Sequence, residues 1–226
     1  SGLGTRTVFG GQITGTGGLT VTGGVGLALT NASNTFSGPI TINSGSLVVS
    51  DPGQLGTGTA PILVSGISAV SPLQPSGMLV FQGGGAGIAV NRAITISGRG
   101  YGSNNNTALL SIGSNTFGGV ITAATANSDN RMIFASGNTT FGVGSTLNLG
   151  AAGTGVMMSG DGNVFLNGLV AQGSSGSNSF YRANLSQIQG TTILTNWNNN
   201  FISNFRLDSG YVRLSHGGQM GLDPSP

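Results

Sequence analysis

The chain has 226 residues, of which only 5% are charged, and its formal net charge is +2. No two of its seven Arg residues are adjacent, so it lacks the clustered basic stripe that neutralises phosphates, and we expect no nucleic-acid partner. The absence of Cys excludes disulfide and thiolate–metal frameworks, and no apolar run reaches the roughly 18 residues of a membrane-spanning helix.

The remaining composition predicts a folded chain that is poor in helix. Hydrophobic residues make up 37% of the sequence, which provides enough apolar surface to offset the conformational entropy lost on folding. The 43 Gly residues interrupt almost every window of ten, and each Gly in a helix interior costs up to about 1 kcal/mol relative to Ala. The best helix candidate is the short segment FYRANLSQIQG at 180–190.

Strand signals, in contrast, follow one another along the whole chain. Each is a short apolar or β-branched run bounded by Gly, Asn, Ser or Asp. About fifteen short strands are predicted, within 16–24, 25–31, 39–45, 45–51, 60–66, 77–84, 87–98, 107–113, 119–125, 131–137, 145–150, 155–160, 163–168, 191–196 and 209–215.

An internal repeat favours a solenoid over an antiparallel sandwich. Residues 33–41 read SNTFSGPIT and residues 114–122 read SNTFGGVIT, with seven of nine positions identical at an offset of 81 residues. A weaker pair relates NSGSLVVSDPGQLG at 43–56 to DSGYVRLSHGGQMG at 208–221. We therefore predict one all-β solenoid domain over 1–226, built from about three degenerate modules at roughly 1–80, 81–165 and 166–226.

The repeated phrase suggests a packing role for each of its residue types. In a stacked coil, its Phe would stack against neighbouring coils. Its Asn would form a turn, using the left-handed region or an amide bond to backbone, and its Gly would permit the bend into the next strand. The structural repeat positions are therefore Asn34, Phe36, Gly38, Asn115, Phe117 and Gly119.

The run VFGGQITGTGGLTVTGGVGLALTNASNTFSGPITINSGSLVVSDPGQLG at 8–56 resembles the passenger-associated repeat of bacterial autotransporters. The matching residues are Phe9, Gly11, Ile13, Gly15, Gly17, Gly18, Leu19, Gly23, Leu27, Leu29, Asn34, Phe36, Gly38, Ile42, Gly45 and Leu47. The Lys that usually follows G-G-L-x is Val21 here. The resemblance implies a right-handed parallel β-helix outside a bacterial cell, in which the repeats help the passenger to fold and to cross the outer membrane. It implies no catalytic residue.

Few residues suggest chemistry, so we expect neither a catalytic site nor a cofactor or metal. Solenoid enzymes that cleave polysaccharides need paired carboxylates, but Glu is absent and the five Asp residues are scattered. Only Arg206, Asp208, Arg213 and His216 cluster in sequence, and they are the candidates for a polysaccharide-degrading enzyme. Trp197, in the Asn-rich segment NWNNNF, and Tyr181 are the candidates for contact with a glycan.

The leading hypothesis is a structural protein that is extracellular or located at the cell surface. An open solenoid end exposes unpaired backbone N–H and C=O groups, and neither end of the sequence contains a charged cap. We therefore predict head-to-tail stacking into a homopolymeric surface fibre, or a place in an autotransporter-like passenger. The alternatives are a carbohydrate-binding adhesin, with a surface or matrix polysaccharide as partner, and a polysaccharide-degrading β-helix enzyme.

Overall fold

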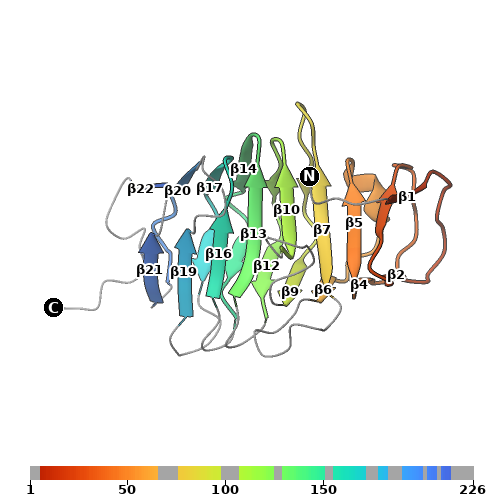
Figure 1. Ribbon diagram of the computed structural model, residues 1–226, viewed down its shortest axis with the longest axis horizontal. Helices are drawn as coiled ribbons and strands as arrows, with labels where there is room; N and C mark the ends of the chain where they lie inside the picture. Colours follow the sequence, from red (N-terminus) through yellow and green to blue (C-terminus); the bar gives the residue numbers. More distant parts are fainter. Residues whose placement is uncertain are drawn as a thin grey trace.

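The strands lie side by side along the long axis of the molecule (Figure 1). The computed structural model describes residues 6–65, 76–97, 107–124, 129–150, 155–171, 178–182, 190–200, 203–207 and 210–214. For 129, 178–182 and 203–206 it describes the backbone alone. Within these ranges there are twenty-two strands and one short 3-10 helix, η1 (Pro52–Leu55).

The strands form three sheets, and all the strand pairs are parallel. Sheet A contains β1 (Arg6–Phe9), β3 (Gly26–Leu29), β5 (Gly45–Val49), β7 (Gly77–Gln82), β10 (Leu109–Ile112), β13 (Asp129–Ala135), β16 (Gly155–Ser159), β19 (Asn178–Arg182) and β21 (Ser203–Leu207). Sheet B contains β2 (Leu19–Val21), β4 (Ile40–Ile42), β6 (Ile62–Ser65), β9 (Ile94–Ser97), β12 (Val120–Ala123), β15 (Thr146–Asn148) and β18 (Leu169–Ala171). Sheet C contains β8 (Ala89–Val90), β11 (Thr116–Phe117), β14 (Asn138–Phe141), β17 (Asn163–Leu166), β20 (Thr191–Leu194) and β22 (Tyr211–Leu214).

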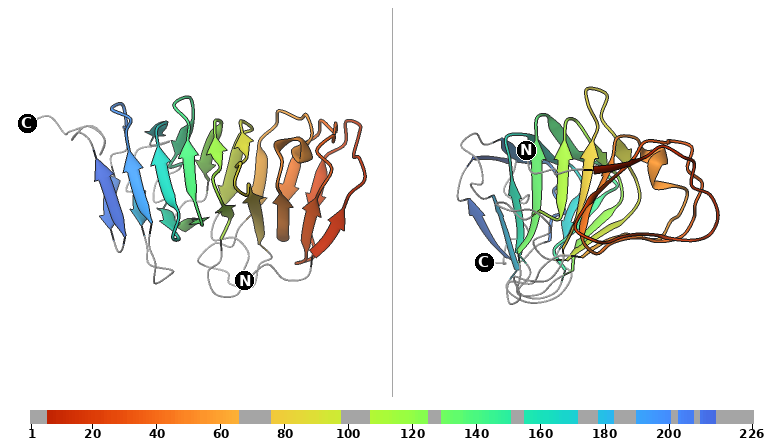
Figure 2. Two further views of the ribbon diagram at one scale, coloured as in Figure 1. Left: turned by 90° about the horizontal axis from the view of Figure 1, so that it is seen from above. Right: turned by 45° about the vertical axis from the view of Figure 1, so that its right-hand side comes forward.

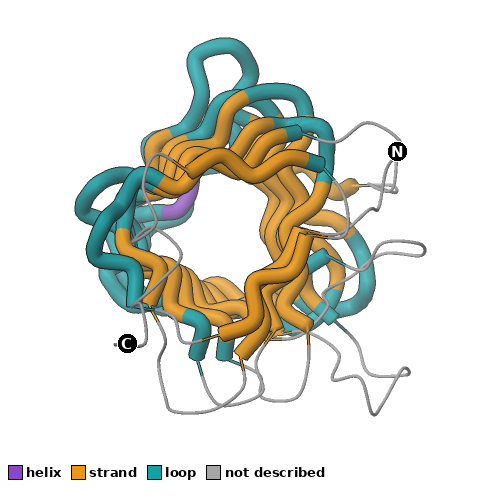
Figure 3. The backbone as a smooth tube through the Cα atoms, turned by 90° about the vertical axis from the view of Figure 1, so that its left-hand side faces the viewer, coloured by secondary structure: helices purple, strands orange, loops and turns teal. Residues whose placement is uncertain are grey.

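One turn of the chain, here called a coil, begins with each strand of sheet A, so the described residues contain nine coils. Viewed along the axis, the strands stack into walls around a common centre (Figure 3). The number of residues between paired positions in neighbouring coils varies, from 20 between Leu27 and Leu47 to 32 between Leu47 and Leu79. The prediction of an all-β parallel solenoid is therefore confirmed, with coils of unequal length.

Alternation along the strands creates the core inside the coils. In β5, Leu47 and Val49 belong to the large apolar cluster that fills the centre. Val48, between them, lies on the outer side of sheet A with Met78 and Val80 in a second, smaller buried cluster. The run GSLVV is therefore buried on both faces, which explains why it reads as a continuous apolar stretch rather than an alternating one.

The first three coils differ from the rest, because sheet C begins only at β8. At the corresponding place they have the loops 10–18, 30–39 and 50–61, and the loops of these coils reach outward in the right-hand view of Figure 2. The third loop contains η1, which Asp51 caps by accepting a hydrogen bond from Gly53 N–H at 2.7 Å. The chain thus builds a two-sheet end and a three-sheet middle.

Three sequence predictions differ from the structure. The segment 87–98 is two strands, β8 and β9, because Asn91–Ala93 turn the corner between sheets C and B. The helix expected at 180–190 is wrong at 180–182, which belong to β19 and pair with β16 and β21, while 183–189 lie outside the described residues. The echo between 43–56 and 208–221 is not a repeated coil position, since β5 lies in sheet A and β22 in sheet C.

Candidate functional site

The repeated phrase occupies the same place in two coils that lie three coils apart. In the second coil, the amide oxygen of Asn34 accepts a hydrogen bond from Ile13 N–H at 2.9 Å, and Thr35 N–H donates to Ile13 C=O at 2.9 Å. In the fifth coil, the amide oxygen of Asn115 accepts from Ile88 N–H at 3.0 Å. Thr116 N–H donates to Ile88 C=O at 2.7 Å. Each Asn-Thr pair therefore completes the backbone bonding of one residue in the preceding coil.

Both asparagines act through their amides, and the left-handed backbone is not used. Among the described residues, Ser136 is the only non-Gly residue with a positive φ. The amide nitrogen of Asn34 donates to Gln54 C=O in the following coil, so this side chain connects three coils. The amide nitrogen of Asn115 donates instead to Ser111 Oγ at 2.8 Å and to Ile112 C=O at 3.2 Å in its own coil.

A third buried asparagine repeats this bond near the other end of the described coils. Asn199 is 1% exposed, and its amide oxygen accepts from Val170 N–H at 2.9 Å. Asn200 N–H donates to Val170 C=O at 3.1 Å. The turn that contains them thus lies against β18, the last strand of sheet B. Asn199 is one of four asparagines in the segment NWNNN at 196–200, and nothing in the sequence distinguishes it from the others.

The two phenylalanines of the phrase are fully buried in the core, three coils apart. The ring of Phe117 lies 5.3 Å from that of Phe81 and 5.5 Å from that of Phe141, measured between centroids. Phe117 also belongs to a row of sheet C residues that are paired in register from coil to coil. That row consists of Val90, Phe117, Phe141, Leu166, Leu194 and Leu214.

The two glycines of the phrase allow neighbouring coils to approach closely. Neither Gly38 nor Gly119 has a positive φ, so a bend that only glycine can adopt is not the reason for their presence. A Cβ at Gly38 would lie 2.5 Å from backbone atoms of Gly17, and one at Gly119 would lie 2.5 Å from Asn91 C=O. Contacts this short do not occur between a real Cβ and backbone, so any side chain here would push the coils apart.

Arg92 is a structural residue that sequence reasoning missed. Its guanidinium donates to Ala60 C=O at 2.6 Å, to Leu55 C=O at 3.0 Å and to Gly38 C=O at 3.2 Å. Burial lowers the pKa of this guanidinium below its ordinary value. The three acceptors belong to the two preceding coils, so one side chain connects coils two, three and four. The sequence did contain a signal for this role, because Arg92 is the only charged residue in the otherwise uncharged run GIAVNRAITIS at 87–97.

The two candidate glycan-contact residues lie in different walls of the solenoid. Tyr181 is part of β19 in sheet A, where it pairs in register with Met157 and Arg206. Trp197 lies in the turn after β20, and its side chain is 61% exposed. The structure does not describe the Tyr181 side chain, so the two are not shown to form one surface.

No catalytic cluster forms among the described residues. Arg206 lies on β21 of sheet A and Arg213 on β22 of sheet C, while Asp208 and His216 lie outside the described residues. In the described ranges, no three His, Cys, Asp or Glu residues are grouped so that they could hold a metal ion.

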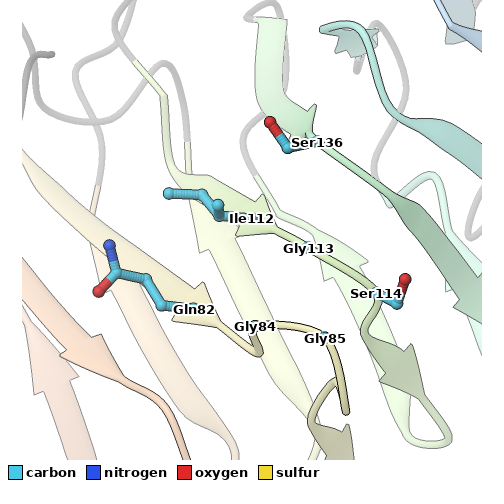
Figure 4. Close-up of a pocket in the computed structure, with 7 residues that line it drawn as sticks. All are labelled: Gln82, Gly84, Gly85, Ile112, Gly113, Ser114 and Ser136. Carbon is cyan, nitrogen blue, oxygen red and sulfur yellow. The ribbon is translucent and has the colours of Figure 1, made fainter.

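An open groove of about 490 Å³ lies at the corner between sheets A and C (Figure 4). The backbone of Gly84, Gly85 and Gly113 forms much of its lining, together with the side chains of Gln82, Ile112, Ser114 and Ser136. None of these lining residues carries a carboxylate, an imidazole or an aromatic ring. The groove therefore provides no acid–base pair and no stacking platform for a sugar.

Apolar side chains gather at the first coil. The side chains of Val8 and Phe9 on β1 are 66% and 44% exposed. Phe9 pairs in register with Leu29, a core residue, so it occupies an inward-facing position of sheet A. Among the described residues, β1 pairs only with β3 and β2 only with β4, which leaves one edge of each strand without a described partner.

The last coil also presents exposed apolar side chains. Leu207 on β21 is 49% exposed, and Tyr211 and Leu214 on β22 are 71% and 39% exposed. Leu214 pairs with Leu194, which is a core residue, and therefore lies in an inward-facing row. Within the described part of the chain, β21 pairs only with β19 and β22 only with β20. Both ends of the described stack thus expose apolar residues beside strand edges that have no partner among the described residues.

Comparison with protein-family models, curated proteins and solved structures finds no match to this chain. The described residues also contain no helix with the length and hydropathy needed to cross a bilayer. The candidate functional site is therefore defined by the structure alone. It consists of the two end coils of the described stack, and of the Asn and Arg side chains that connect the coils between them.

Proposed function

We propose that the protein is a structural β-solenoid subunit, extracellular or at the cell surface. It stacks head-to-tail into a fibre or forms part of an autotransporter-like passenger. The observation that carries this proposal is that, among the described residues, the first and the last coil both have exposed apolar side chains and a strand edge without a partner. Open edges template pairing with another chain, and a contact between unlike ends does not close on itself.

The proposal includes a right-handed winding of the chain. Connections between parallel strands of one sheet are right-handed in almost all proteins, because right-twisted strands pack back onto the sheet only in that sense. The resemblance of 8–56 to the passenger-associated repeat points in the same direction, and it also supports an extracellular location. The role assigned here is mechanical and needs no catalytic residue.

Electron microscopy of the purified full-length chain tests the stacking. Nine coils at the roughly 4.8 Å spacing of paired strands give an axial repeat of about 43 Å in a fibre. We expect negative-stain images to show fibres with that repeat, and their number to rise with protein concentration. A chain that remains monomeric at high concentration in light scattering would overturn the proposal.

A carbohydrate-binding adhesin is the second candidate, supported by the exposure of Trp197 in an Asn-rich turn. An exposed indole can stack on a sugar ring, and amide groups can bind hydroxyls. Glycan-array binding that is lost in Trp197→Ala and kept in Tyr211→Ala, another highly exposed aromatic, would support it. Absence of binding to any glycan by the unaltered protein would exclude it.

A further inference from the structure

Only one of the three sheets has described strands that reach both ends of the solenoid. Sheet A runs from β1 in the first coil to β21 in the ninth. Sheet C starts at β8 in the fourth coil, and sheet B ends at β18 in the seventh. A strand ladder that continues from one copy into the next therefore has strands available on both sides of the junction only in sheet A.

At the C-terminal end, the outer edge of β18, the last described strand of sheet B, is already occupied. Asn199 and Asn200 already bond to the N–H and C=O of Val170, the middle residue of β18. A second copy would have to displace this turn in order to pair with β18. At the N-terminal end, the place of sheet C in the first coil is taken by the loop 10–18, which offers no strand. Both features therefore favour sheet A as the sheet that continues across the junction.

The register of sheet A predicts which residues of the two copies would pair at such a junction. One row of paired positions runs through all nine strands, and its described core members Leu47, Leu79, Leu109, Met132 and Met158 are each 0% exposed. The complete row consists of Thr7, Leu27, Leu47, Leu79, Leu109, Met132, Met158, Arg182 and Leu207. Its two end members, Thr7 and Leu207, are exposed, because no described strand lies beyond them.

We propose that β21 of one copy pairs in parallel with β1 of the next, with Leu207 opposite Thr7, so that sheet A is continuous through the fibre. This inference rests on the proposed function and specifies its interface. Leu207 would then be covered by the following coil, as Leu47 and Leu79 are within the chain. A slip of one residue would place Leu207 opposite Val8, whose side chain faces outward, and would leave Leu207 unmatched in the core.

Backbone groups of β1 suit this pairing. Phe9 C=O accepts a hydrogen bond from Thr30 N–H, so the N–H and C=O of Phe9 face β3. Because successive residues of a strand direct their backbone groups to opposite sides, the N–H of Val8 faces the open edge. A donor at the centre of β1 is therefore in place for a second parallel strand.

Disulfide trapping tests the register, and the chain is well suited because it contains no Cys. The double variant Thr7→Cys/Leu207→Cys should form a ladder of oligomers on non-reducing gels, since paired strands place Cα atoms about 5 Å apart, within disulfide range. The control Val8→Cys/Leu207→Cys has one thiol on the wrong face and should form at least tenfold less. Fibres without preferential trapping of the first pair would overturn this inference and leave stacking intact.

A second pair of variants tests the same edge without thiols. Val8→Pro removes the outward N–H, and proline is tolerated on an edge strand, so the monomer should melt as before while fibre formation falls by at least tenfold. Val8→Ala keeps the N–H and should assemble normally. Fibres that persist in Val8→Pro would overturn the β1–β21 junction, whereas the absence of fibres in the unaltered protein would overturn both this inference and the proposed function.

Discussion

At the scale of single residues, buried polar side chains connect coils that the backbone ladder alone would join only along the strands. Asn34, Asn115 and Asn199 each accept a hydrogen bond from a backbone N–H of the preceding coil at a place where the chain turns. Arg92 also connects coils, by donating hydrogen bonds to three backbone carbonyls of the two preceding coils. Corners leave backbone groups without ladder partners, so side chains that supply them stabilise the stack.

Replacing Asn115 should destabilise the fold. In Asn115→Ala, the N–H of Ile88 loses its partner in a buried place, which costs about 1–3 kcal/mol of the free energy of unfolding. Asn198→Ala, in an exposed asparagine, should change that free energy by less than about 0.5 kcal/mol. Urea unfolding followed by circular dichroism measures both, and equal effects would show that the amide bond does not contribute.

Replacing Arg92 should also weaken the packing between coils. We expect Arg92→Ala to lower the free energy of unfolding by about 1.5–3 kcal/mol, because three carbonyls lose a charged donor. Arg92→Lys should recover only part of this loss, since one ammonium cannot reproduce the planar fork of a guanidinium. Arg213→Ala, in an exposed arginine on β22, is the matched control, and a loss as large there would argue against a specific role for Arg92.

At the scale of elements, the distance between coils depends on where glycine lies at the corners. The strands of sheets B and C are short, down to two residues in β8 and β11, so the corners determine how closely successive coils pack. Gly38 and Gly119, which precede β4 and β12, each face the backbone of the coil before. This explains why glycine is needed in both copies of the repeated phrase.

A matched pair of glycine substitutions tests this explanation. In Gly38→Ala, the new methyl group would lie 2.5 Å from the backbone of Gly17, and we expect a loss of about 1–3 kcal/mol from overpacking. In Gly17→Ala, on the facing corner, the methyl group would meet nothing within 4 Å, and the free energy of unfolding should not fall by more than about 0.5 kcal/mol. Thermal melts of the two variants that coincide would contradict the close-approach argument.

At the scale of the whole molecule, stability comes from stacking and burial, with little contribution from charge. The chain has seven Arg, five Asp and one His in 226 residues, and it has no Lys or Glu. The core is a column of apolar side chains that continues through the coils from Val21 to Leu194. Each coil covers the one before it, so the end coils are the places where this burial is incomplete.

Unfolding should therefore depend little on salt or pH. Between about pH 5.5 and 9, the ordinary pKa values leave only the single His and the terminal amine to titrate. We expect the free energy of unfolding to change by less than about 1 kcal/mol over that range, and between 0.05 and 1 M NaCl, because surface ion pairs contribute little. A strong loss of stability in high salt would show that ion pairs hold the fold.

Much of this architecture could be predicted from the sequence. The recurring short β-branched runs, the scarcity of helix and the duplicated SNTF phrase depend on local steric preference and on a repeating environment, so they predict a parallel solenoid. The phrase does mark equivalent corners, since Asn34 and Asn115 make the same bond to a preceding Ile. The two-residue strand β11 was not predicted, and β8 was merged with β9 in the predicted strand 87–98, because strands this short show no alternation of their own.

The sequence by itself determined that this chain forms stacked parallel strands, because alternation, glycine spacing and an uncharged composition act locally. Only the tertiary structure decided which coil neighbours which, and with that the roles of Arg92 and Asn199, because their partners lie between 29 and 54 residues away. The same holds for the two ends. Among the described strands, only those of sheet A extend from the first coil to the ninth, which follows from how the unequal coils stack, and no local pattern contains that information.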